Sequence, residues 1–209
     1  MTIYEPATLL TDYLLAILGA VLAWRLHRRA LITVPAVRWW FLALVVLSIS
    51  ALVGGSYHGF APNFSTFVDR IWWQGALWII CLLGYTMGNA LICELVPTHR
   101  QAIWKRLVIG KFLLASAGVI FSPNFIVVII DYGSIMLLWA LAALTFRRRW
   151  SAWVITAVLL SALAAWIQQS GLSLSTHLNH NDIFHIIQAF ALLGFYQSAC
   201  LMTPLKAAD

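Results

Sequence analysis

Long apolar segments, separated by short polar connections, recur along the whole chain. A transmembrane α-helix needs about 20 predominantly apolar residues, whereas membrane-spanning strands alternate in polarity and are about half as long. We therefore predict seven transmembrane helices, at residues 9–24, 40–58, 69–96, 104–121, 125–146, 151–167 and 182–205. The connections are too short for a second domain, so we expect residues 1–209 to form one all-α transmembrane domain.

The composition agrees with a surface that faces lipid. Hydrophobic residues make up 62% of the chain and charged residues only 10%, where a soluble domain carries about a quarter. The expected partners are therefore membrane lipids. The net charge of +6 does not indicate nucleic-acid binding, because the basic residues are scattered among short loops.

These basic residues predict the orientation of the chain. Twelve of the 13 lie in the odd-numbered loops, at the start of the fourth segment or in the C-terminal tail, and only Arg70 lies on the other side. Loops rich in Lys and Arg remain in the cytoplasm. We expect the N-terminus outside and the C-terminus inside, in a bacterial inner membrane. The acids expected on or near the outer side are Glu5, Asp12, Asp69, Asp131 and Asp182.

Three polar groups interrupt the apolar pattern, and all of them fall at the predicted outer ends of helices. They are the stretch 177–185 before and within the seventh segment, the sequence Ser56-Tyr57-His58 that ends the second, and Asp69 at the start of the third. Ionisable groups in membrane segments are costly and usually functional. We expect His58, Asp69 and His185 to converge.

Histidines and acids in this arrangement are candidate zinc ligands, because a catalytic zinc usually has three protein ligands and one open position. Residues three or four apart share a helix face, so Asn181 and Asp182 flank the face of His185. His180 reaches the same site if the helix starts at about Asn181. Asp182 is also a suitable residue for a helix N-terminus.

The positions of His58, Asp69 and His185 resemble those in the CREST superfamily, which includes alkaline ceramidases and adiponectin-receptor-like proteins. The interval of 11 residues between His58 and Asp69 is similar to that of the ceramidases. The sequence at 181–185, Asn-Asp-Ile-Phe-His, resembles the His-Gln-Ile-Phe-His of the receptor-like group. The resemblance implies a seven-helix zinc hydrolase that acts on a lipid amide or ester, with His58 and His185 as zinc ligands.

Two positions depart from the pattern of that superfamily. Asn181 replaces the first histidine of the seventh helix, so His180 or Asp182 would supply the third zinc ligand. Gly54 stands at the position of a serine, and Ser56 is displaced from it by two residues.

In the implied mechanism, Asp69 acts as general base or orients the zinc-bound water, whose pKa the metal lowers. Ser56 or Tyr57 would then hydrogen-bond the developing oxyanion.

The alternative is a non-catalytic membrane protein that binds or senses a lipid or small ligand through the same pocket. A complete set of three metal ligands would favour the enzyme. A site with only His58 and His185 would favour the binding protein.

Overall fold

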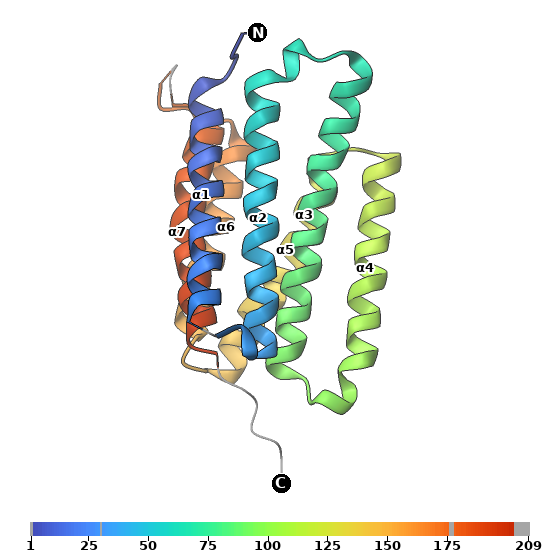
Figure 1. The fold of residues 1–209 in the computed structure, drawn as a ribbon, viewed down its shortest axis with the longest axis vertical. Helices are drawn as coiled ribbons and strands as arrows, with labels where there is room; N and C mark the ends of the chain where they lie inside the picture. Colours follow the sequence, from blue (N-terminus) through green and yellow to red (C-terminus); the bar gives the residue numbers. More distant parts are fainter. Residues whose placement is uncertain (1, 30, 176–177, 203–209) are drawn as a thin grey trace.

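The computed structural model describes residues 2–29, 31–175 and 178–202, and over these ranges the chain is all-α (Figure 1). Seven long helices follow one another, as the apolar pattern predicts. They are α1 (Pro6–Arg28), α2 (Pro35–Phe60), α3 (Thr66–Leu95), α4 (Gln101–Phe121), α5 (Phe125–Phe146), α6 (Ser151–Ser170) and α7 (His180–Cys200). Residues 203–205, which were expected to extend the seventh helix, and Lys206 lie outside the described ranges.

Local sequence signals set several helix boundaries beyond the apolar runs. A proline begins α1 and another begins α2, since proline fits the first turn of a helix. Ser65 accepts a hydrogen bond from the amide of Val68, so α3 starts three residues before Asp69. Gly171, with φ of 69°, ends α6 in the left-handed conformation that favours glycine.

Six of the helices form a closed ring around a central space. Each packs against the next in the order α1, α2, α3, α5, α6 and α7, and α7 packs back against α1. Helix α4 lies outside this ring and packs mainly against α3 and α5, at the edge of the molecule in Figure 1. The first and last helices are therefore neighbours, and they start at the same end of the bundle (Figure 1).

The outer surface of the ring is apolar, and its helices are long. Every helix except α4 is long and apolar enough to cross a membrane. On α1, the residues that point outward are large and apolar at intervals of three or four: Leu10, Leu14, Ile17 and Val21. A soluble protein would place polar side chains there. The length of the helices and their exposed apolar faces indicate a membrane protein.

Helix α4 differs because it carries Lys105, Arg106 and Lys111. Lys111, at its midpoint, forms an ion pair with the buried carboxylate of Asp131 on α5 and donates to the Asp131 carbonyl at 2.6 Å. The charge pattern predicts Asp131 on or near the outer side and counts Lys111, in the predicted fourth segment, among the inner cations, but the structure joins the two residues. A Cβ atom at Gly84 of α3 would lie 2.5 Å from Asp131 Oδ2, so the glycine makes room for the carboxylate.

We expect Lys111→Met to lower the free energy of unfolding in detergent by about 3 kcal/mol, because it leaves the buried Asp131 carboxylate without its counter-ion. The variant Asp131→Leu strands the lysine instead. The double variant removes both charges and should recover much of the loss, which thermal or denaturant unfolding of all four proteins would measure. A double variant with the summed loss of both single variants would show that the two charges do not stabilise one another.

Candidate functional site

His58 at the end of α2 and His185 near the start of α7 lie side by side inside the ring. Their ring centroids are 6.4 Å apart and their planes are at 70°. Both side chains line a central cavity of about 190 Å³. The sequence predicts that His58, Asp69 and His185 converge. The structure brings the two histidines together, but Asp69 lies outside the cavity that they line.

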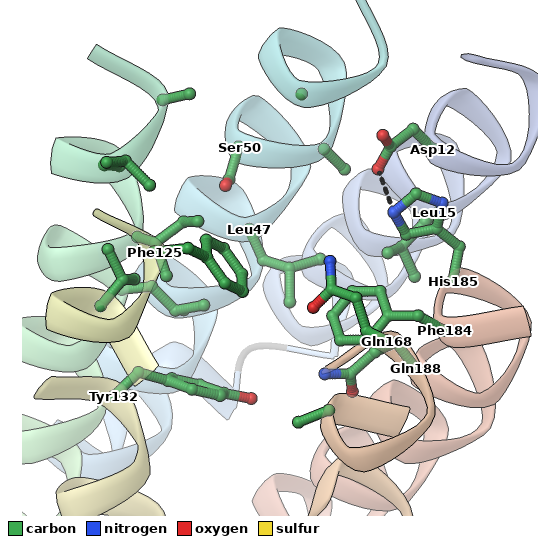
Figure 2. A pocket seen from close by; sticks show the side chains of 18 of the residues that line it. Asp12, Leu15, Leu47, Ser50, Phe125, Tyr132, Gln168, Phe184, His185 and Gln188 are labelled. Atoms are coloured by element: carbon green, nitrogen blue, oxygen red, sulfur yellow. Dashed lines mark ion pairs between the residues drawn. The ribbon is translucent and has the colours of Figure 1, made fainter. Parts of the chain in front are cut away.

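The closest partners of His185 come from α1. Its Nε2 atom lies 3.1 Å from Oδ1 of Asp12 (Figure 2), and its Nδ1 atom lies 3.0 Å from the hydroxyl oxygen of Thr11. Asp12 and His185 are both buried, with only 4% and 6% of their surfaces exposed. An acid and an imidazole are therefore paired inside the ring, at the interface of the first and last helices.

The contacts of His185 constrain the proton within this pair. The Thr11 hydroxyl lies 3.0 Å from the carbonyl of Thr8 and 3.0 Å from Nδ1 of His185. A proton must then lie between Nε2 of His185 and the carboxyl group of Asp12, because two lone pairs would repel one another. The pair therefore shares one proton.

Sequence reasoning missed Asp12 as a site residue and counted it only as an outer acid. A signal was present, because Thr8, Thr11 and Asp12 form a polar stripe at helical spacing on an otherwise apolar helix. Gly55 of α2 makes room for Asp12, whereas a side chain at Gly54 would only touch it. A Cβ atom at Gly55 would lie 2.7 Å from Cβ of Asp12, and one at Gly54 would lie 3.5 Å from its Oδ2 atom.

His58 has a more open environment than His185. Its Nδ1 atom lies 3.1 Å from Oε2 of Glu5, the residue that precedes α1, and 26% of its side chain is exposed. His58 therefore lies between the surface of the protein and the cavity.

Ser56 and Asp69, the expected catalytic residues, do not line the cavity, and both form hydrogen bonds elsewhere. Ser56 donates to the carbonyl of Leu52 at 2.8 Å and lies 2.9 Å from the hydroxyl of Tyr13. Asp69 accepts a hydrogen bond from the hydroxyl of Tyr57 at 3.0 Å.

The start of α7 decides the roles of His180 and Asp182. The side chain of Asn179 accepts hydrogen bonds from the amides of Asn181 and Asp182, and the Asp182 carboxylate accepts from the Asn179 amide at 2.8 Å. This reciprocal arrangement is a capping box, and it begins the helix at His180.

The other oxygen of Asp182 accepts from the hydroxyl of Thr8 on α1 at 2.9 Å. Both carboxylate oxygens of Asp182 thus hold the end of α7, and neither His180 nor Asp182 lines the cavity.

The arrangement does not fit the zinc site that the family resemblance implies. Within the described ranges, no group of three or more His, Cys, Asp or Glu side chains is arranged to hold a metal ion. To bind a metal, Nε2 of His185 and Oδ1 of Asp12 would both have to face it. In the structure these two atoms face one another instead. His180 and Asp182, the two candidates for the third ligand, are placed at the cap of α7.

The cavity extends from the Asp12–His185 pair toward α3 and α5, and all six helices of the ring contribute to its walls. Aromatic and aliphatic side chains form most of its surface, among them Trp73, Phe125 and Phe184. Figure 2 shows Phe125 and Tyr132 on one side of this space, with Gln168, Phe184 and Gln188 on the other. The chemistry of the lining is thus apolar, with polar groups at a few positions.

Comparison with known proteins gives a family and no assigned activity. No curated protein and no solved structure matches the chain. One family, described as "Family of unknown function (DUF6962)", matches residues 7–204, which is nearly the whole chain. The chain therefore belongs to the DUF6962 family.

Proposed function

We propose that this chain is an integral membrane protein that binds a lipid or another small amphipathic ligand in the cavity inside its helix ring. The observation that carries this proposal is the combination of apolar cavity walls with a buried, proton-sharing Asp12–His185 pair. Ligand pockets are usually apolar with a few polar groups that fix orientation. Ionisable groups held within membrane segments are also more often functional than structural.

The size of the cavity suggests how much of a ligand it holds. Its volume of about 190 Å³ exceeds that of an engineered protein cavity of about 150 Å³ that binds benzene. Pockets for whole drug-sized ligands are larger, at roughly 300–1,000 Å³. The cavity therefore suits a compact small molecule, or the polar head and first carbons of a lipid whose chain extends between helices.

A matched pair of alanines on α6 tests this use of the cavity. We expect Ala165→Phe, which adds a ring to the cavity wall, to reduce the amount of lipid that copurifies with the protein at least tenfold. Ala162→Phe places the same ring on the exposed face of the same helix and should leave this amount unchanged. Native mass spectrometry after gentle detergent extraction measures both. Equal lipid retention by the two variants would contradict binding in this cavity.

The zinc-dependent lipid hydrolase is the second candidate function. Its support is the side-by-side arrangement of His58 and His185, which the resemblance to the CREST superfamily anticipates. Asp12 is the acid nearest to His185, so it would be the third ligand only if its bond to Nε2 of His185 were exchanged for a metal.

Metal content distinguishes the two functions. Under the binding proposal, we expect protein expressed with added zinc to contain much less than one zinc per chain, because His185 and Asp12 are committed to one another. Elemental analysis of wild type, His58→Ala, His185→Ala and Asp12→Asn provides the measurement. One zinc per wild-type chain, lost in all three variants, would favour the hydrolase.

We also propose that all seven helices, including α4, cross the membrane with the N-terminus outside and the C-terminus in the cytoplasm of a bacterial cell. The loop cations carry this assignment, since Lys111 belongs to the interior of α4 and leaves the direction of the charge bias unchanged. In this orientation, Asp12, His58 and His185 lie in the outer half of the membrane, where a lipid of the outer leaflet would reach them.

Reporter fusions test the orientation. A fluorescent protein that folds only in the cytoplasm should be bright when fused to the C-terminus and dark when fused to the N-terminus, with equal amounts of both fusions in the membrane fraction. The reverse pattern would invert the topology, and fluorescence from both fusions would indicate an even number of crossings.

A further inference from the structure

A second group of polar side chains lies in the cavity beside the Asp12–His185 pair. Ser161 of α6 donates to Oε1 of Gln188 on α7 at 2.9 Å. The hydroxyl of Tyr132 on α5 lies near both of them. Gln168 of α6, two turns after Ser161, also lines the cavity. Figure 2 shows Tyr132 reaching toward the glutamines from the opposite wall.

The side-chain amide of Gln168 is incompletely satisfied. Its nitrogen donates to Oδ1 of Asn181 at 3.3 Å, which is a long hydrogen bond. Its Oε1 atom is buried and has no hydrogen-bond partner among the residues that the structure describes. Buried polar atoms almost always have a partner, so an unpaired acceptor in a cavity wall points to a donor supplied from outside the chain.

The four side chains carry no formal charge in their ordinary states, and aromatic and aliphatic residues surround them. An ionised group beside them would lose its hydration and would meet no opposite charge among these four side chains, which is unfavourable. An uncharged hydroxyl or N–H group would gain the acceptor of Gln168 at little cost. Aromatic side chains such as Phe125 and Phe184 would cover the adjoining carbon atoms of the same ligand.

We propose that Gln168, together with Tyr132, Ser161 and Gln188, forms a recognition subsite for an uncharged amphiphile that carries a hydroxyl or N–H donor. The subsite selects such a ligand over one with an ionised carboxylate or phosphate in the same place. It deepens the binding function proposed above and rests on it. Gln168 is the specificity-determining residue, because its Oε1 atom is the acceptor that the ligand completes.

Adjacent glutamines provide a controlled test. Gln168→Leu removes the unpaired acceptor but keeps the size of the side chain, whereas Gln169→Leu makes the same change at an exposed position. The probes are 1-monooleoylglycerol, which has free hydroxyl groups, methyl oleate, which has no donor, and oleate, which is ionised. Each probe is titrated against the full chain in detergent, and native mass spectrometry gives the bound fraction.

We expect wild type and Gln169→Leu to bind 1-monooleoylglycerol about tenfold more tightly than methyl oleate, the difference that one buried hydrogen bond produces. Oleate should bind more weakly than 1-monooleoylglycerol. In Gln168→Leu, the preference for 1-monooleoylglycerol over methyl oleate should disappear, while methyl oleate still binds. Retained binding of methyl oleate shows that the variant is folded.

Two results would overturn the subsite and leave the binding function intact. One is equal affinity of wild type for 1-monooleoylglycerol and methyl oleate, and the other is a preference that persists unchanged in Gln168→Leu. Tightest binding of oleate would also overturn it, in favour of a site for an ionised group. If Ala165→Phe binds all three probes as well as wild type does, the cavity is not their site, and the proposed function fails together with the subsite.

Discussion

The contact between α1 and α7 closes the helix ring, and the cavity depends on it. Two polar levels build this contact: Thr8 with Asp182, and one turn further along, Asp12 with His185. The two helices run in the same direction, so the steps of four residues on α1 and three on α7 keep the levels aligned. A shift of either helix by one residue would break both pairs and bury unpaired polar groups, which is costly. Apolar packing alone would not prevent such a shift. These two pairs, which we call the polar ladder, therefore set the register of α1 against α7, although Thr8 and Asp182 are 174 residues apart in sequence.

The same ladder limits the chemistry of the two histidines. His185 directs both ring nitrogens at α1, toward Thr11 and Asp12, and His58 directs Nδ1 at Glu5. Residues that look like metal ligands in the sequence thus find partners within the protein. What the cavity presents to a ligand is the imidazole of His58, a shared proton and several neutral hydrogen-bonding groups. This favours recognition over nucleophilic or metal-assisted hydrolysis, and it is the physical basis for preferring the binding function.

Apolar run length was sufficient to predict the seven helices, because only a helix satisfies the backbone of a long apolar segment in lipid. The meeting of His58 and His185 was also predictable, since alternating helices bring these two ends to one level. Asp12 was not identified, because an acid near the start of an apolar run is also a common interfacial residue. Asp182 allowed two interpretations, ligand or cap, and the spacing from Asn179 favours the cap. The ring order and the outer position of α4 depend on packing between helices, which apolar periodicity does not encode.

The two buried aspartates follow one structural rule. Asp12 pairs with His185 and lies against Gly54 and Gly55 of α2, while Asp131 pairs with Lys111 and lies against Gly84 of α3. In each case a histidine or lysine on a second helix is the partner of the carboxyl group, and a glycine on a third helix leaves space for it. A carboxylate needs both in the membrane, because an unpaired charge is costly there and a side chain at the glycine position would push the acid away from its partner. One aspartate closes the ring and the other attaches α4 to its outside, so three-helix junctions of this kind hold the parts of the fold that apolar contacts alone would leave free to slide.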